Sequence, residues 1–101
     1  MYKFYNKYLG LMFRNLKDNE VAVLKFKKEG YYPIHTFFVF YPIDVLWLND
    51  KKKVVYIKRN IKPFNLKVSP NKKSKYILEF KAGFSKNMKT EQRINFYNNK
   101  K

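Results

Sequence analysis

The chain has 101 residues, of which 46% are hydrophobic and 20% aromatic, enough to fill one core and too apolar for a disordered segment. It contains no cysteine, which excludes a disulfide framework and a thiolate metal site. The formal net charge of +16 favours nucleic acid or another acidic partner, although lysines spread along the whole chain are also typical of a compositional bias of a proteome. We expect a single domain over residues 1–101.

The N-terminal third is expected to hold one short helix and the first strand. Apolar residues recur at helical spacing between Tyr5 and Phe13, a run too short to span a bilayer and followed by no small-residue cleavage site. We therefore expect a cytoplasmic protein without a signal peptide or a membrane segment. Residues 15–20 are polar and loop-like, Val21 to Phe26 is typical of a strand, and Lys27 to Gly30 is typical of a turn.

The centre of the chain, residues 34–59, concentrates β-branched and aromatic residues and predicts the middle of a β-sheet. Ile34 to Phe40 is expected to be a strand buried on both faces, and a proline then breaks the ladder. Ile43 to Leu48 predicts the next strand. Asn49 to Lys52 is a polar sequence of the kind found in four-residue hairpin loops, and Lys53 to Arg59 is expected to be the returning strand.

The C-terminal third predicts further strands around one flexible loop. Phe64 to Val68 alternates apolar and polar residues and favours a short, half-exposed strand. Lys75 to Lys81 alternates in the same way and favours a longer one. Ala82 to Met88 is expected to form a short helix, residues 94–96 to end the sheet, and residues 98–101 to be a frayed basic tail.

Asp44 is the most informative polar residue, because it is a carboxylate between two β-branched residues of a hydrophobic strand. A buried carboxylate needs a cation or several hydrogen-bond donors. One interpretation is structural: Asp44 accepts hydrogen bonds from backbone N–H groups of a neighbouring loop, or pairs with Arg14. The other is functional: Asp44 faces a ligand in a cleft. In the same region, Trp47 and Phe38 are predicted to be core residues.

Catalytic and metal-binding patterns are sparse. The single histidine, His35, lies among apolar residues, where a hydrogen-bonded structural role is more common than catalysis. No serine sits in a nucleophile-elbow setting, no acidic residues show metal-ligand spacing, and no glycine-rich phosphate loop occurs. We therefore predict no catalytic residue, no metal and no cofactor. The candidate polar cluster, for binding or for structure, consists of Arg14, His35, Asp44 and Glu79.

Three sequence blocks together resemble one family. The first is Gly10-Leu11-Met12-Phe13-Arg14, the second is the aromatic run from Phe37 to Leu48 with Pro42-Ile43-Asp44 inside it, and the third is Tyr76 to Gly83. In this order, over about residues 8–96, they resemble the family called domain of unknown function 192 (also uncharacterised protein family 0127). His35-Thr36-Phe37-Phe38 is similar to the archaeal form of the second block.

The sequence departs from the family pattern at two places. Tyr8-Leu9 stands where an Ala-Arg pair usually precedes the first block, and Asn87 to Gln92 replaces a Gly-x-Lys-x-Gly-Asp turn. We expect that turn to differ, with Asn87 in the left-handed conformation that a glycine would supply. The resemblance implies a mainly β single domain, either a β-sandwich or a partly open barrel with one or two short helices, and it implies no activity.

Three hypotheses about function remain open. The first is a small non-enzymatic β-rich binding or interaction module for a small ligand or a protein, which uses either a concave patch near His35, Asp44 and Glu79 or an exposed aromatic patch. The second is weak, sequence-independent binding of nucleic acid by lysines, with Tyr or Phe as stacking platforms. The third is an enzyme with a carboxylate-lined cleft, which needs two ionisable groups of perturbed pKa in one pocket. The sequence leaves the oligomeric state open.

Overall fold

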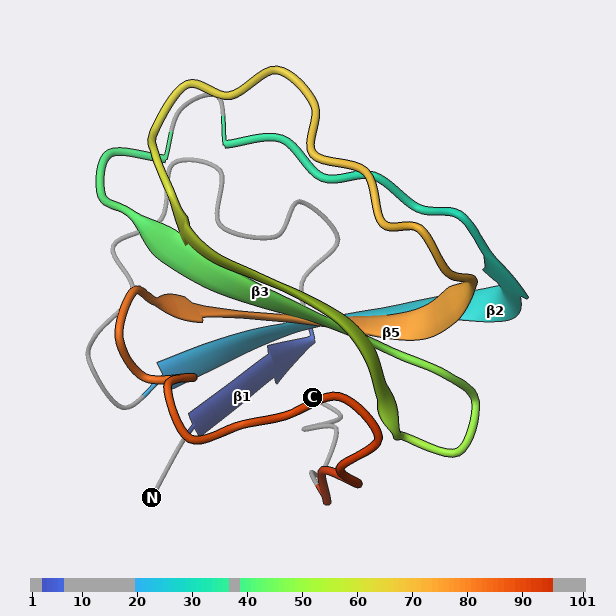
Figure 1. Cartoon of the computed structure of the whole chain (residues 1–101). Helices are drawn as coiled ribbons and strands as arrows, with labels where there is room; N and C mark the ends of the chain where they lie inside the picture. Colours follow the sequence, from blue (N-terminus) through green and yellow to red (C-terminus); the bar gives the residue numbers. More distant parts are fainter. Residues whose placement is uncertain (1–2, 7–19, 37–38, 96–101) are drawn as a thin grey trace.

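The computed structural model describes residues 3–6, 20–36 and 39–95, which form one open, five-stranded sheet with its connections (Figure 1). The strands are β1 (Lys3–Asn6), β2 (Glu20–Gly30), β3 (Ile43–Leu48), β4 (Val54–Ile61) and β5 (Ser74–Lys81). Their order across the sheet is β1-β2-β5-β3-β4, with β1 parallel to β2 and the other neighbouring pairs antiparallel. These three ranges contain no helix. The mainly β, single-domain fold expected from the sequence is confirmed, in the form of an open sheet.

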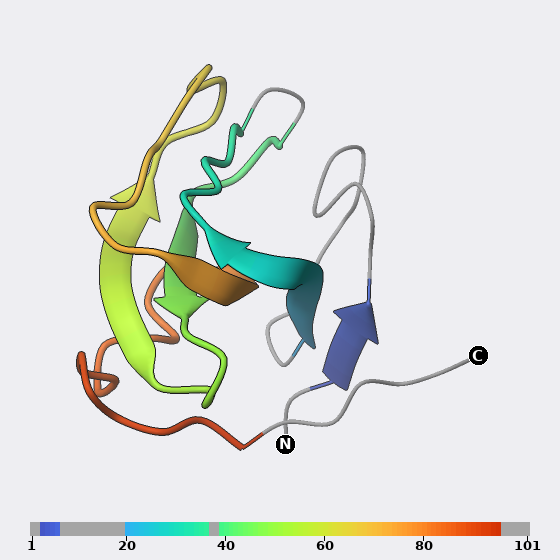
Figure 2. The same cartoon turned by 90° about the vertical axis from the view of Figure 1, so that its right-hand side faces the viewer.

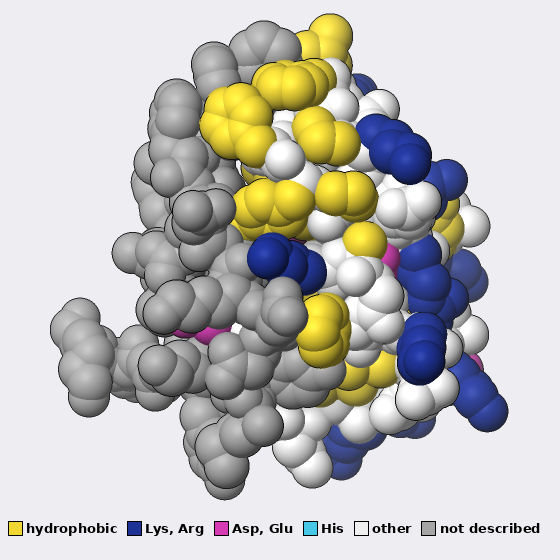
Figure 3. Space-filling model, turned by 90° about the vertical axis from the view of Figure 1, so that its left-hand side faces the viewer, with side chains coloured by type: hydrophobic (Ala, Val, Ile, Leu, Met, Phe, Trp, Pro, Cys, Tyr) yellow, Lys and Arg dark blue, Asp and Glu magenta, His cyan; other side chains and the backbone are white. Residues whose placement is uncertain are grey.

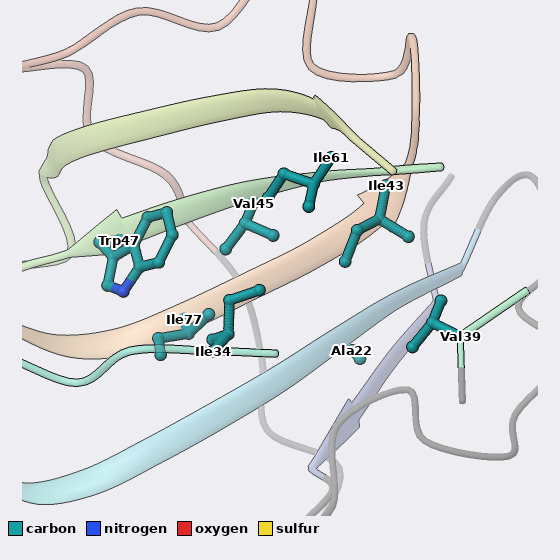
Figure 4. Packing of buried hydrophobic residues seen from close by; sticks show 8 residues of the cluster. All are labelled: Ala22, Ile34, Val39, Ile43, Val45, Trp47, Ile61 and Ile77. Carbon is teal, nitrogen blue, oxygen red and sulfur yellow. The ribbon is translucent and has the colours of Figure 1, made fainter. Parts of the chain in front are cut away.

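One face of the sheet is covered by the segment that connects β2 to β3. Ile34 and Val39 of this segment belong to the same buried cluster as Trp47 of β3 (Figure 4). Trp47 is 0% exposed, and its indole Nε1 donates a hydrogen bond to the backbone carbonyl of Tyr32, 2.8 Å away. The prediction that Trp47 is a core residue is therefore confirmed, while Phe38 lies outside the described residues.

The opposite face is covered by the C-terminal segment. A second buried cluster gathers alternate residues of β2, β3 and β5, and Met88 and Ile94 pack against it. In β5 this cluster contains Tyr76, Leu78 and Phe80, as the period-two pattern of a strand predicts. Because both faces of the sheet are covered, all six residues of β3 are buried and its sequence is almost continuously apolar.

The hairpin between β3 and β4 forms as the sequence predicts. The side-chain oxygen of Asn49 accepts hydrogen bonds from the backbone N–H groups of Lys51 and Lys53, at 2.9 and 3.0 Å. Lys52 adopts a left-handed φ of 64°. The returning strand continues beyond the expected end and stops at Ile61, and β5 agrees with the prediction apart from one added residue at its start.

The expectation that Ile34 to Phe40 is a central strand is wrong. In the described part of this segment, strand-like pairing is limited to an isolated bridge between Ile34 and Val68, and Phe40 is 65% exposed. The segment instead hydrogen-bonds to residues 64–68, so the short strand expected there is reduced to the same bridge. An apolar run of this length can cover a sheet as well as belong to it, because both settings bury its side chains.

The helix expected from Ala82 to Met88 is also wrong, because residues 82–87 form turns. Gly83 has a φ of 102°, which lies outside the helical region. The N–H groups of Gly83 and Ser85 donate to the carboxylate of Asp44. A side chain distant in sequence thus binds amide groups at the point where the helix was expected to begin.

Several element boundaries differ from the expectations. The strand β2 begins at Glu20, which was expected in a loop, and it continues through the turn expected at residues 27–30, with a register shift after Lys25. In the turn after residue 87, the left-handed residue is Glu91 (φ 70°) rather than Asn87. Residues 3–6 form β1 where a helix was expected to begin. Of the strand expected at residues 94–96, residues 94 and 95 form no strand, and an isolated bridge pairs Arg93 with Lys53. The rest of that helix, and the tail, lie outside the described residues.

Candidate functional site

Asp44 is 1% exposed and holds two connections of the sheet in place. Its Oδ1 accepts a hydrogen bond from the N–H of Asn60, 2.9 Å away at the end of β4, where the backbone has a left-handed φ of 54°. Its Oδ2 accepts from the N–H groups of Gly83 and Ser85, at 3.0 and 3.2 Å, and from the Ser85 hydroxyl at 2.7 Å. The structural interpretation, in which Asp44 binds loop N–H groups, is therefore confirmed for these contacts.

Arg59 completes this arrangement from β4. Its Nε donates to the Ser85 hydroxyl oxygen at 3.1 Å, and its Nη2 donates to the backbone carbonyls of Ser85 and Met88, at 2.9 and 2.6 Å. Ser85 thus lies between an acid and a guanidinium, but it is 0% exposed and is out of reach of a substrate. Sequence reasoning named Arg14 as the candidate cation, which lies outside the described residues, and it missed both Arg59 and Ser85.

Among the described residues, Glu79 is not brought to Asp44. In the antiparallel register of β3 and β5, Asp44 is opposite Phe80, whereas Glu79 is opposite Val45. Because successive residues of a strand point to opposite faces, Asp44 and Glu79 lie on different sides of the sheet. Glu79 is buried at 4% exposure. His35 is exposed in the segment before β3.

Among the described ionisable groups, Asp44 and Arg59 bind backbone and hydroxyl groups of the fold. The described residues contain no group of three or more His, Cys, Asp or Glu side chains that could hold a metal ion. Among the same residues, no helix is long and apolar enough to cross a membrane. The sequence also suggested an exposed aromatic patch, and the described residues contain one.

That patch lies at one end of the sheet, where β3 begins and β4 ends. We call this region the loop end and define it as residues 34–36, 39–42 and 62–68. Figures 1 and 2 show its two loops next to each other, beyond the ends of these strands and far from the hairpin at residues 49–52. Phe40, Phe64 and Leu66 are 65%, 53% and 76% exposed, and the Phe40 and Phe64 rings meet edge to face with centroids 5.6 Å apart.

Thr36 joins the two loops of this region. Its hydroxyl donates to the Lys62 carbonyl at 2.7 Å and accepts from the Asn65 N–H at 2.8 Å. Its backbone N–H donates to the Asn65 carbonyl, and its carbonyl accepts from the N–H groups of Phe64 and Val39. Thr36 itself is 0% exposed, and its two hydroxyl bonds are partly buried. These hydroxyl and backbone bonds therefore join residues 62–65 and Val39 to Thr36.

The exposed charged side chains of the loop end, in the part that the structure describes, are lysines. Lys62 and Lys67 are exposed within the loop end, and Figure 3 shows hydrophobic side chains gathered at this end of the molecule with Lys and Arg side chains beside them. The exposed carboxylates of the described residues are Glu29, Asp50 and Glu91.

All three of these carboxylates belong to the opposite, hairpin end of β4. The Glu29 carboxylate accepts from the Asp50 N–H at 2.9 Å, and the Glu91 N–H donates to the Val54 carbonyl at 2.7 Å. The eight residues of β4 separate the two ends by about 25 Å at the usual rise of a strand.

Comparison with known proteins supports the resemblance noted in the sequence. The sequence model of the DUF192 family, described as Uncharacterized ACR, matches residues 2–96. The UPF0127 protein of Pyrococcus abyssi is 33% identical over 88 residues, which cover 87% of this chain and 74% of that protein. The UPF0127 protein of Thermococcus kodakarensis is 32% identical over 90 residues, which cover 88% of this chain and 56% of that protein. The chain therefore spans little more than half the length of the second relative.

A solved structure shares the fold. The crystal structure of a protein of unknown function from Novosphingobium aromaticivorans superimposes with a TM-score of 0.82, over 94% of this chain and 74% of that protein, at 17% sequence identity. Both UPF0127 relatives are archaeal proteins, in agreement with the archaeal form of the second sequence block. The match of the family model over most of the chain, together with these relatives, places the chain in a defined family: it belongs to the domain of unknown function 192 family.

Proposed function

We propose that this protein is a non-enzymatic binding module and that its binding surface is the loop end. The observation that carries the proposal is the exposure of Phe40, Phe64 and Leu66, each more than half exposed, on loops whose backbone Thr36 holds. Exposed apolar side chains that gather in one place, with polar residues around them, mark interaction sites, whereas scattered ones carry no such meaning.

The polar residues support binding rather than catalysis. Asp44 directs both carboxylate oxygens at structural donors, and Glu79 belongs to the other face of the sheet. A pair of ionisable groups in one pocket, as acid–base chemistry requires, is not formed by these two residues. The concave patch considered for His35, Asp44 and Glu79 therefore receives no support, and the aromatic patch does.

A small amphipathic anion tests this proposal without knowledge of the natural partner. Anilinonaphthalene sulfonate combines apolar rings with one negative charge, and so matches a surface of phenylalanine, leucine and lysine. We expect a titration followed by amide NMR shifts to perturb residues 62–67 and the neighbours of Phe40 in a saturable way. Shifts confined to the hairpin end, or no saturable shifts, would contradict the proposal.

Nucleic acid is the second candidate partner, and the distribution of charge favours it. Among the described residues, the exposed carboxylates lie at the hairpin end, so the rest of this surface carries lysine and arginine. Lysines act on phosphates as point charges without a defined geometry. Such binding is therefore expected to be weak and independent of sequence.

A further inference from the structure

We propose that the occupant of the loop end is the surface of an anionic lipid bilayer. This inference rests on the proposed function, because it names the partner of that same surface. Phe40, Phe64 and Leu66 enter the region between headgroups and acyl chains, and Lys62 and Lys67 remain at the level of the lipid phosphates. The protein thus lies on the membrane without crossing it.

The first argument is the chemistry of the exposed side chains. Phe40, Phe64 and Leu66 have no polar atom in their side chains, and they are 65%, 53% and 76% exposed. A leucine offers no flat surface on which a base could stack. The Phe40 and Phe64 rings meet at an interplanar angle of 72°, so they present no common stacking platform. Apolar side chains that project from loop tips are suited to an acyl-chain environment.

The second argument is the pairing of the loop backbone. Where water is scarce, an unpaired N–H or carbonyl group carries a large energetic cost. Thr36 supplies partners to the N–H groups of Phe64 and Asn65 and to the carbonyls of Lys62 and Asn65. The Asn65 side chain also donates to the Lys62 carbonyl at 2.9 Å. The loop tip can therefore leave water with these polar groups already paired.

The third argument is electrostatic. Lys62 and Lys67 stand on either side of Phe64 and Leu66 in the sequence and are exposed. The exposed carboxylates of the described residues lie at the far end of β4, about 25 Å away by strand length, and the screening length at physiological salt is about 8 Å. An anionic surface at the loop end therefore meets lysines without repulsion from these acids. Lysine beside an anionic surface strengthens association.

The experiment measures co-sedimentation with vesicles of phosphatidylcholine, with and without phosphatidylglycerol. We expect saturable binding that requires phosphatidylglycerol. Leu66→Ser should weaken the partition roughly tenfold, since it removes most of one buried side chain. Lys62→Gln and Lys67→Gln should each weaken it by about fivefold. Tyr31→Ser is the matched control: Tyr31 is 61% exposed but directly follows β2 at the hairpin end, and its loss should leave the partition unchanged.

A tryptophan reporter distinguishes insertion into the bilayer from adsorption driven by charge alone. The native Trp47 is fully buried and should not respond to lipid. Phe64→Trp should show a blue-shifted emission on vesicles and quenching by brominated acyl chains, whereas Tyr31→Trp should show neither. Equal quenching of the two reporters, or vesicle binding that does not depend on Leu66, would overturn the lipid assignment.

The outcomes also separate this inference from the proposed function. If vesicles do not bind while anilinonaphthalene sulfonate still perturbs residues 62–67, the lipid assignment is wrong and the loop end remains a binding surface. An oligonucleotide could also bind. If Leu66→Ser weakens oligonucleotide binding more than it weakens vesicle binding, the occupant is nucleic acid and the lipid assignment is again wrong. If neither the anion nor the vesicles contact the loop end, both proposals are wrong.

Discussion

The hydroxyl of Ser85 donates a hydrogen bond to the carboxylate of Asp44 across 2.7 Å, although the two residues are 41 positions apart in the sequence. Both side chains are buried, Asp44 at 1% and Ser85 at 0% exposure. The contact joins the start of β3 to the turns that follow β5. It explains how a carboxylate is tolerated within a hydrophobic strand, since a buried charge is stable only when donors surround it.

Replacement of Asp44 should therefore reduce stability. Asp44→Asn keeps the shape of the side chain but loses its charge, and hydrogen bonds to a charged group contribute about 1.5–3 kcal/mol each. Asp44→Ala should cost more, because the N–H groups of Asn60, Gly83 and Ser85 lose their acceptor. Chemical denaturation measures both. Asp50→Asn, in the exposed hairpin, serves as the control, and unchanged midpoints in both Asp44 variants would refute the structural role.

The sequence predicted that Asp44 is bound by hydrogen-bond donors, but it identified only part of them. A carboxylate between Ile43 and Val45 must have hydrogen-bond donors around it when the strand is buried. The sequence around Asp44 is enough to predict this. The donors themselves come from residues 60 and 83–85, and a single sequence does not show which distant loop folds back. Arg59 illustrates the same limit: its role depends on the position of Ser85 across the sheet.

The strands were predictable where alternation or continuous burial produced a strong local pattern. Ile43 to Leu48 and the Asn49 hairpin follow from composition and turn chemistry. Ile34 to Phe40 has an equally apolar composition, yet its described residues form no strand, and Ile34 and Val39 pack over the sheet. The difference depends on Thr36, whose partners are Lys62 and Asn65, so it depends on contacts distant in the sequence. The exposure of Phe40 and Phe64 also depends on contacts distant in the sequence, so the sequence alone did not predict it.

Removal of the Trp47 side chain should strongly destabilise the fold. Deletion of a buried aromatic side chain typically costs about 3–5 kcal/mol, a large part of the stability of a small domain. Trp47→Phe should cost less than Trp47→Ala but remain measurable, because the Tyr32 carbonyl loses the donor that Nε1 supplies. Urea denaturation followed by far-UV circular dichroism separates the three proteins. A Trp47→Ala midpoint equal to that of the parent would show that the residue is not part of the core.

The Thr36 hydroxyl can be tested with a nearly isosteric change. Thr36→Val keeps the volume but leaves the Asn65 N–H without its acceptor, while the Lys62 carbonyl keeps only the bond from the Asn65 side chain. An unpaired buried polar group costs about 1–3 kcal/mol. We expect a lower denaturation midpoint and faster hydrogen exchange at residues 62–68. Thr90→Val, at an exposed threonine, is the control and should change neither. Equal exchange rates in the two variants would show that Thr36 does not hold these loops.

Binding of nucleic acid should be weak and strongly dependent on salt. If about five lysines contact phosphates, the logarithm of the binding constant should fall against the logarithm of salt concentration with a slope of roughly −4. Fluorescence anisotropy with single-stranded oligonucleotides of different sequence measures this slope. Tight binding at physiological salt with a clear preference for one sequence would instead make nucleic acid the main partner.

The most direct test of a binding role for the loop end compares stability with affinity in the same variants. Phe64→Ser and Leu66→Ser remove exposed side chains, so we expect denaturation midpoints close to that of the parent, within about 0.5 kcal/mol in free energy of unfolding. In the same proteins, the affinity for anilinonaphthalene sulfonate should fall by roughly tenfold, the loss expected when most of one buried apolar side chain is removed. Tyr31→Ser should change neither quantity. A loss of stability with unchanged affinity would mean that these side chains serve the fold, and it would contradict the binding role of the loop end.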